Sequence, residues 1–257
     1  MMNCKPAPTP MNVNESLITE DGTGLAEARR FRSMVGGLNY LSHTRPDIAF
    51  SVRVISRFMH NPTLHHYGAA KRILRYVAGT INLGIWYTKV SDFKLVGFSD
   101  SDWAGCAEER KSTSGYTFSL GSGAISWSSK KQEVVALSSS EAEYVAVTAA
   151  ACQAVWLRRL LSDFLQVQKG ATEILCDNKS TISMTNNPAY HSRTKHIDIR
   201  YHFIRSLVAS DDIVLKYCNT NEQVADILTK SLPQAKHLFF REQLGVCDFE
   251  SRGMLNK

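Results

Sequence analysis

The sequence lacks the features that mark membrane, secreted and disulfide-rich proteins. No run approaches the ~20 apolar residues that a transmembrane helix requires, and the first residues lack the apolar core of a secretory signal. The six cysteines are widely spread and include no C-x-x-C pair, so they indicate neither a zinc site nor a disulfide framework. Internal repeats and low-complexity tracts are also absent. We therefore expect an intracellular protein with reduced thiols and no membrane association.

The charge is unevenly distributed along the 257 residues, whose net charge is +6. Residues 1–92 hold 11 Lys and Arg against 6 Asp and Glu, whereas residues 93–257 hold 19 against 18. A basic segment beside an acid-bearing region is typical of nucleic-acid enzymes, in which cations hold phosphates and acids hold metal ions. The alternative is an ordinary solvated surface, because charge alone carries little specificity.

Apolar periodicity divides the chain into four regions. Residues 1–24 contain Pro and Gly among polar residues, which predicts a flexible leader. Residues 25–92 show helical spacing and predict a small helical segment with three short helices. Residues 93–245 predict the order βββαβαβα, and residues 246–257 form a tail. The expected fold class is α/β: a mixed five-stranded sheet, three antiparallel strands plus two parallel ones, with flanking helices.

The individual elements follow from the same patterns. Strands are expected at 93–99, 116–120, 124–127, 172–176 and 213–217, with a further β-prone run at 81–87. Helices are expected at 141–164, from 178, at 196–208 and from 222, the first of them capped by one of the serines at 138–140.

Four carboxylates lie near the ends of these predicted elements: Asp100, Glu143, Asp177 and Asp226. Ligands in α/β sheets commonly collect at the carboxyl ends of strands, so these acids can meet at one sheet edge. Without a cation they would repel one another, whereas Mg²⁺ prefers hard oxygen ligands of this kind. The set therefore predicts a metal site, and two ions ~3.5–4 Å apart can support phosphodiester cleavage.

Other conspicuous residues near these acids have more ordinary interpretations. Asp102 follows Asp100 by two positions, but Trp103-Ala104-Gly105 indicates a turn, so we expect a structural role for Asp102. Trp103 and Trp127 are expected in the core rather than stacked on nucleotides.

Several short strings carry a family resemblance. They include Phe98-Ser99-Asp100-Ser101-Asp102-Trp103, Arg110-Lys111-Ser112-Thr113-Ser114-Gly115, Asp177-Asn178-Lys179-Ser180, Arg193-Thr194-Lys195-His196-Ile197 and Ala225-Asp226-Ile227-Leu228-Thr229-Lys230. Over residues 93–245 the chain resembles the ribonuclease H region of copia-type retrotransposon Pol polyproteins. Residues 31–90 resemble the stretch of that polyprotein that joins the reverse transcriptase to its ribonuclease H.

This resemblance implies a ribonuclease H-like fold and an endoribonuclease that cuts the RNA strand of RNA–DNA hybrids. Asp100, Glu143, Asp177 and Asp226 would be its catalytic acids and would hold two Mg²⁺ ions, for which Mn²⁺ can substitute. The implied partners are the hybrid and the remainder of a reverse transcriptase, and the implied location is the cytoplasm.

The choice of Glu143 over Glu141 also rests on the resemblance. The two lie two positions apart on a helix and cannot share a face, and Ala142-Glu143-Tyr144-Val145-Ala146 resembles the family pattern around the catalytic Glu. Two departures from the wider pattern stand out. No Tyr-x-Asp-Asp stretch is present, so DNA synthesis is not expected. No His precedes Asp226 in 217–222, so proton transfer would use water, Glu222 or no group at all.

Substrate-binding residues are expected around the third acid. Asn178 and Ser180 follow Asp177 at a helix start, where they can cap the helix, bind a phosphate or do both. Three residues of the next, basic loop are further candidates for a phosphate contact: Arg193, Lys195 and His196. The alternative is that this loop is simply solvated.

Three functions compete for this sequence. The first is the metal-dependent hybrid endoribonuclease. The second is a catalytically silent retrotransposon remnant that only binds nucleic acid or a partner protein, against which the presence of all four acids argues. The third is a transposase or integrase of the same broad fold, against which the acid of the last predicted helix, Asp226, argues.

Overall fold

The computed structural model describes residues 4–90, 93–186 and 195–248, and its centre is a five-stranded sheet in the order β4-β3-β2-β5-β6. The strands are β2 (Leu95–Ser101), β3 (Thr113–Leu120), β4 (Ala124–Lys131), β5 (Thr172–Cys176) and β6 (Ile213–Tyr217). β2, β3 and β4 pair antiparallel, β5 pairs parallel with β2, and β6 pairs parallel with β5. The predicted fold class is confirmed.

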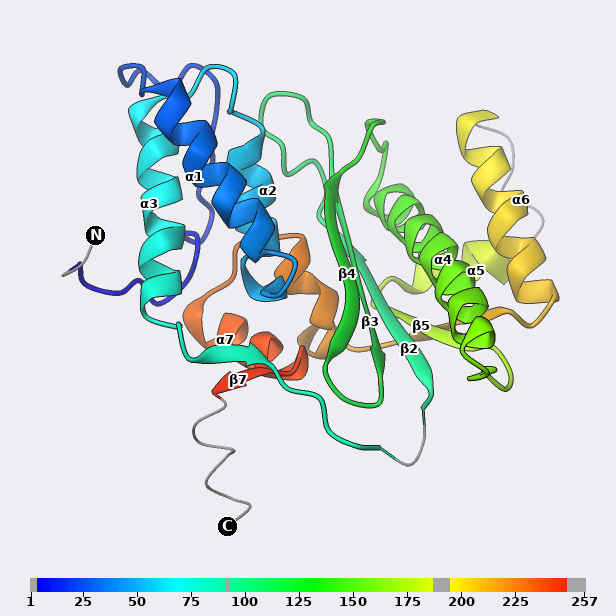
Figure 1. The fold of residues 1–257 in the computed structure, drawn as a ribbon. Helices are drawn as coiled ribbons and strands as arrows, with labels where there is room; N and C mark the ends of the chain where they lie inside the picture. Colours follow the sequence, from blue (N-terminus) through cyan, green and yellow to red (C-terminus); the bar gives the residue numbers. More distant parts are fainter. Residues whose placement is uncertain (1–3, 91–92, 187–194, 249–257) are drawn as a thin grey trace, which may run out of the picture.

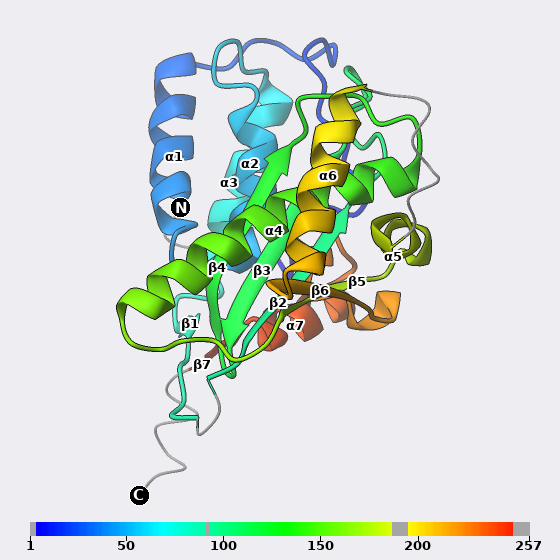
Figure 2. The ribbon, with the colours of Figure 1, turned by 90° about the vertical axis from the view of Figure 1, so that its right-hand side faces the viewer.

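Helices cover both faces of this sheet (Figure 1). One face carries α4 (Ser139–Asp163), α5 (Lys179–Asn186) and α6 (Lys195–Ala209), of which α4 and α6 lie in front of the strands in Figure 2. α4 begins where expected, because the Ser138 hydroxyl accepts a hydrogen bond from the Glu141 N–H at 3.2 Å. No helix in the described part of the chain is long and apolar enough to cross a membrane.

The other side of the sheet carries the helical segment. Its elements are α1 (Ala28–Leu41), the 3-10 helix η1 (Pro46–Ile48), α2 (Ala49–Ser56) and α3 (Leu64–Ala78). The structure therefore has the three expected helices, and they share a buried apolar cluster that is separate from the cluster between the sheet and α4.

Residues 4–24 pack against this segment, which corrects the expectation of a flexible leader. Ala7, Met11 and Leu17 are buried in the same cluster as the three helices. The Arg75 guanidinium also donates to the Lys5 carbonyl at 2.7 Å. Three apolar side chains among the prolines thus anchor this stretch in the buried cluster, which its polar composition did not indicate.

The last predicted helix is also wrong in its position. Instead of one helix from residue 222, two 3-10 turns, η2 (Thr220–Glu222) and η3 (Val224–Leu228), come before α7 (Gln234–Gln243). The Asp226 carbonyl accepts hydrogen bonds from the Thr229 N–H, the Lys230 N–H and the Thr229 hydroxyl, each at 3.2 Å.

The expected tail begins with a strand rather than with irregular chain. Val246–Asp248 forms β7, which pairs antiparallel with β1 (Leu83–Ile85) in a second, two-stranded sheet. The β-prone run at 81–87 therefore contributes a strand, but outside the central sheet. Residues 249–257 lie outside the described part of the chain.

A buried ion pair connects the helical segment to α7. Arg45 and Asp47 pair at 2.7 Å with side chains that are 5% and 0% exposed. The Tyr76 hydroxyl donates to Asp47 at 2.7 Å, and Arg241 of α7 donates to the Tyr76 hydroxyl at 3.4 Å. His237 Nε2, also from α7, lies 3.2 Å from the Asp47 carbonyl oxygen. These contacts hold α7 against the segment that precedes the sheet in sequence.

Replacing Asp47 by Asn should therefore destabilise the whole chain. The change leaves the Arg45 guanidinium buried without its counter-charge, and we expect a loss of about 3 kcal/mol in the free energy of unfolding measured with urea. Glu27→Gln removes an exposed pair with Arg30 and should cost less than about 1 kcal/mol. Equal effects of the two changes would contradict this account.

Candidate active site

Asp100 lies on the central strand β2 and is only 2% exposed. Its register partner on β3 is Gly115. A Cβ atom at Gly115 would lie 2.7 Å from the Thr229 side chain and 2.9 Å from that of Leu228. A glycine is needed here because the chain that carries Asp226 crosses the strand at close range, and this crossing brings Asp226 to Asp100.

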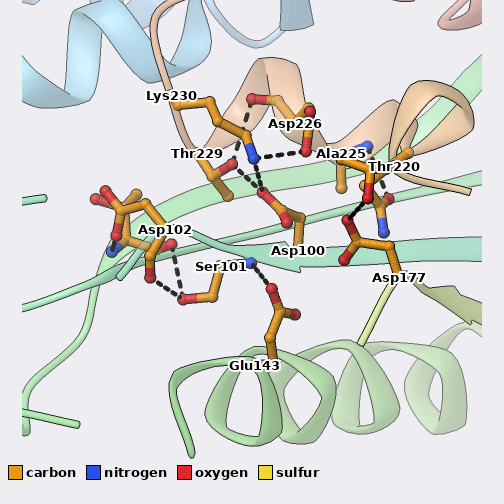
Figure 3. Close-up of polar contacts among 12 residues, drawn as sticks. Asp100, Ser101, Asp102, Glu143, Asp177, Thr220, Ala225, Asp226, Thr229 and Lys230 are labelled. Carbon is orange, nitrogen blue, oxygen red and sulfur yellow. Dashed lines mark hydrogen bonds and ion pairs between the residues drawn. The ribbon is translucent and has the colours of Figure 1, made fainter. Parts of the chain in front are cut away.

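Glu143 reaches the same place from the first turns of α4. The Ser101 N–H donates to Glu143 Oε1 at 3.1 Å, and the Cys176 thiol donates to Oε2 at 3.9 Å. Glu141 points elsewhere, because it accepts a hydrogen bond from the Leu137 N–H at 2.8 Å. Of the two candidate glutamates, the structure therefore brings Glu143 to the other acids (Figure 3).

Asp177 directly follows the end of β5, the strand that pairs parallel with the strand of Asp100. The Thr220 hydroxyl of η2 donates to Asp177 Oδ2 at 2.8 Å. One potential ligand atom each from Glu143, Cys176 and Asp177 lie within 4.8 Å of one another. Burial raises the pKa of the Cys176 thiol well above its ordinary value, and the negative charge of Glu143 is the second-largest cause. Cys176 is therefore a protonated donor to Glu143.

Asp226 lies on η3 and is fully buried. Both of its oxygens are engaged by ammonium groups: Lys230 Nζ lies 2.9 Å from Oδ1, and Lys236 Nζ lies 3.0 Å from Oδ2. Lys230 Nζ is also 3.6 Å from Asp100 Oδ2, to which the Thr229 hydroxyl donates as well. Figure 3 shows Lys230 between the two acids.

The electrostatics of the cluster favour a bound cation. Burial and the neighbouring carboxylates raise the pKa of Asp100 to about 6 and that of Glu143 to about 10, although the Lys230 ammonium lowers both. Although burial lowers the pKa of Lys230, Asp100 and Asp226 raise it above its ordinary value overall. A raised pKa means that the ionised form of the carboxylate is unfavourable in the metal-free site. A bound cation would stabilise this ionised form.

The donor set fits a hard divalent cation. Four carboxylates from β2, α4, the end of β5 and η3 converge, and the nearby thiol is protonated. Oxygen ligands of this kind suit Mg²⁺ or Mn²⁺ better than softer metals.

The neighbouring candidates take structural positions. Asp102 accepts a hydrogen bond from the Thr113 N–H, and burial raises its pKa to about 6. The Trp127 ring donates to the Ser42 carbonyl at 3.1 Å and is partly buried. Trp103 is 61% exposed, so its expected place in the core is wrong. It follows a turn at the strand end, and the alternation of strand residues does not bury it there.

The predicted substrate-binding residues are only partly described. Asn178 caps α5, since its Oδ1 accepts a hydrogen bond from the Thr181 N–H at 3.0 Å, and Ser180 is exposed on that helix. Arg193 and the side chains of Lys195 and His196 lie outside the described residues.

Sequence reasoning did not identify Lys230 as part of the site. It lies four residues after Asp226, and that spacing is a common one for an ion pair on a helix. Its second contact, with Asp100, joins residues far apart in the sequence and has no local signal.

Comparison with known proteins gives the family. No family model matches the chain. It is 43% identical over 246 residues to the retrovirus-related Pol polyprotein from transposon RE1 of Arabidopsis thaliana, covering 96% of this chain and 17% of that protein. It is 42% identical over 253 residues to the Pol polyprotein from transposon TNT 1-94 of Nicotiana tabacum, covering 96% and 19%. Among solved structures, an RNase H1 isolated from compost superposes with a TM-score of 0.41 at 14% identity, covering 53% of this chain and 93% of that one.

The chain belongs to the family of retrovirus-related Pol polyproteins of copia-type transposons. It spans less than a fifth of the length of the two curated relatives named above. The sheet with its flanking helices has the mixed five-stranded α/β architecture that the sequence predicted for residues 93–245.

The raised pKa values make stability depend on pH. An acid whose pKa is higher in the folded state binds its proton more tightly there, so this stability is complete below the unfolded pKa and is lost as the pH rises through the folded pKa. The window runs from 3.8 to about 6 for Asp100 and from 4.5 to about 10 for Glu143. We expect metal-free protein to lose unfolding free energy between about pH 5 and pH 8, at up to about 1.4 kcal/mol per pH unit for each acid inside its window.

The Glu143→Gln variant isolates this effect, because its amide is neutral at every pH. Urea unfolding across the same pH range should give a flatter curve for Glu143→Gln than for the wild-type chain. Glu242→Gln, which changes an exposed acid on α7, should keep the wild-type slope. A Glu143→Gln curve as steep as the wild type would show that the acid cluster does not cause the pH dependence.

Proposed function

We propose that this chain is a metal-dependent endoribonuclease that hydrolyses the RNA strand of RNA–DNA hybrids. The observation that supports this most directly is the convergence of Asp100, Glu143, Asp177 and Asp226 from four separate elements at one edge of a ribonuclease H-like sheet. Membership of the Pol polyprotein family supports the same reaction class.

The residues of the chain would act by holding cations and keeping the acids in place. Asp100, Glu143, Asp177 and Asp226 are the residues that would hold the cations. Divalent cations bound there would supply Lewis-acid stabilisation of the attacking and leaving oxygens of the scissile phosphate. Ser101 orients Glu143, and Thr220 orients Asp177.

The acids need this support because a metal site depends on the orientation of its ligands as much as on their charge. Each of the four carboxylates accepts a hydrogen bond or forms an ion pair with a residue outside the set. These contacts come from backbone N–H groups, hydroxyls and ammonium groups, which remain donors throughout the neutral pH range.

Recognition of the hybrid would depend on positive charge beside the acids. Residues 1–92 hold most of the excess of Lys and Arg, and the helical segment formed from them packs directly on the domain that carries the acids. In the longer polyprotein this segment would continue into the remainder of a reverse transcriptase, which we propose as the partner that positions the substrate.

Cleavage of a labelled RNA–DNA hybrid by the full chain tests the proposal. With Mg²⁺ we expect the RNA strand to be cut, and Asp177→Asn should lower the rate at least ~100-fold because it removes one charge at the reacting phosphate. EDTA should abolish cleavage, and Mn²⁺ should restore it. Single-stranded RNA and duplex RNA serve as substrates that should remain intact.

The matched control is Asp163→Asn, the same change at an exposed acid at the end of α4. It should retain the wild-type rate. A wild-type chain that is folded yet cuts nothing in Mg²⁺ or Mn²⁺ would overturn the proposal and favour the catalytically silent remnant.

A further inference from the structure

The acid cluster already contains a cation. The Lys230 ammonium lies 2.9 Å from Asp226 Oδ1 and 3.6 Å from Asp100 Oδ2. These two acids come from η3 and β2, and Lys230 is the described lysine that pairs with both of them. Its position between the two carboxylates offsets the repulsion that their burial would otherwise make costly.

The surroundings of Lys230 allow the ammonium to leave this position. Its side chain is 39% exposed, whereas those of Asp100 and Asp226 are 2% and 0% exposed. The flexible four-carbon stem can therefore turn towards solvent without unfolding the site. Asp100 would keep its hydrogen bond from the Thr229 hydroxyl.

Lys236 takes a different place, although it too pairs with Asp226. It holds the other oxygen, Oδ2, and its ammonium lies 5.4 Å from the centre of the Phe240 ring on α7. No ion pair joins Lys236 to Asp100 among the described residues. Lys236 thus anchors Asp226 to α7, while Lys230 occupies the space between the two acids.

An ammonium and a divalent cation would compete at that space. Both are attracted by the same carboxylate oxygens, and at short range they repel each other. A divalent cation that uses Asp100 and Asp226 together must therefore displace Lys230, and part of its binding free energy is spent on breaking these ion pairs.

We propose that Lys230 is the resident counter-ion of the Asp100–Asp226 pair, which holds the two carboxylates together before a divalent cation binds and withdraws when one does. This inference rests on the proposed function, because it concerns the same acids. It assigns to Lys230 a positioning role. The ammonium keeps the two carboxylates in place when no metal is bound, and its presence lowers the affinity of the site for a divalent cation.

The Lys230→Met variant tests this, because Met keeps the length of the side chain and removes its charge. We expect calorimetric titration with Mg²⁺ to show a Kd about tenfold lower than that of the wild type, since the competing ammonium is gone. In EDTA the same variant should melt roughly 3 °C lower than the wild type, because the two acids then lack their counter-ion.

Three further variants keep the test decisive. Lys230→Arg retains a cation and should stay within about twofold of the wild-type Kd, and Lys230→Gln replaces Lys230→Met if that variant does not fold. Lys216→Met is the matched control, because it removes a lysine on β6 that pairs with Glu173 at 2.9 Å, away from the acids. It should leave the Kd for Mg²⁺ unchanged.

The outcomes separate this inference from the proposed function. If the wild type binds Mg²⁺, Asp100→Asn loses that binding, and Lys230→Met binds no more tightly than the wild type, then the counter-ion role is overturned while the metal site stands. If neither the wild type nor Lys216→Met binds Mg²⁺, the proposed metal-dependent function itself fails.

Discussion

Repulsion among four carboxylates at one edge of the sheet is the constraint on which the site depends. Three of these acids are buried, and the chain offsets their charge with donors and cations: the Ser101 N–H on Glu143, the Thr229 hydroxyl on Asp100, and Lys230 with Lys236 on Asp226. This compensation is partial, because burial still raises the pKa of Asp100 to about 6 and that of Glu143 to about 10 despite these contacts. The arrangement keeps charged groups together at a place where a cation can bind.

The helical segment is part of this arrangement rather than an appendage. The η3 turn that carries Asp226 lies between the sheet and the helices of the other side, and it shares a buried cluster with Ala49 of α2 and Phe240 of α7. Asp47 and Tyr76 of this segment contact His237 and Arg241 of α7, the helix that also supplies Lys236 to Asp226. The helical segment therefore helps to position an acid of the domain that contains the central sheet.

Local sequence signals gave the sheet and most of the helices. Strands β5 and β6 have the bounds expected from their alternation, and the Ser138 cap marked the start of α4. Contacts between residues that are far apart in the sequence could not be predicted from these local signals. The final helix was misplaced because the turn around Asp226 is held by tertiary contacts, and the Lys230–Asp100 pair has no signal in the sequence. The sequence predicts the four acids, with the choice of Glu143 resting on a resemblance, but the positions of Trp103 and residues 4–24 depend on packing that composition does not reveal.

The most direct test of the central claim is the anomalous diffraction of Mn²⁺ in crystals of the full chain. Our account predicts anomalous peaks between the carboxylates of Asp100, Glu143, Asp177 and Asp226, with the Lys230 ammonium moved away from Asp100. Crystals that show no Mn²⁺ at these acids, or that hold it elsewhere while Lys230 keeps both ion pairs, would contradict the claim that this edge of the sheet is a metal-dependent active site.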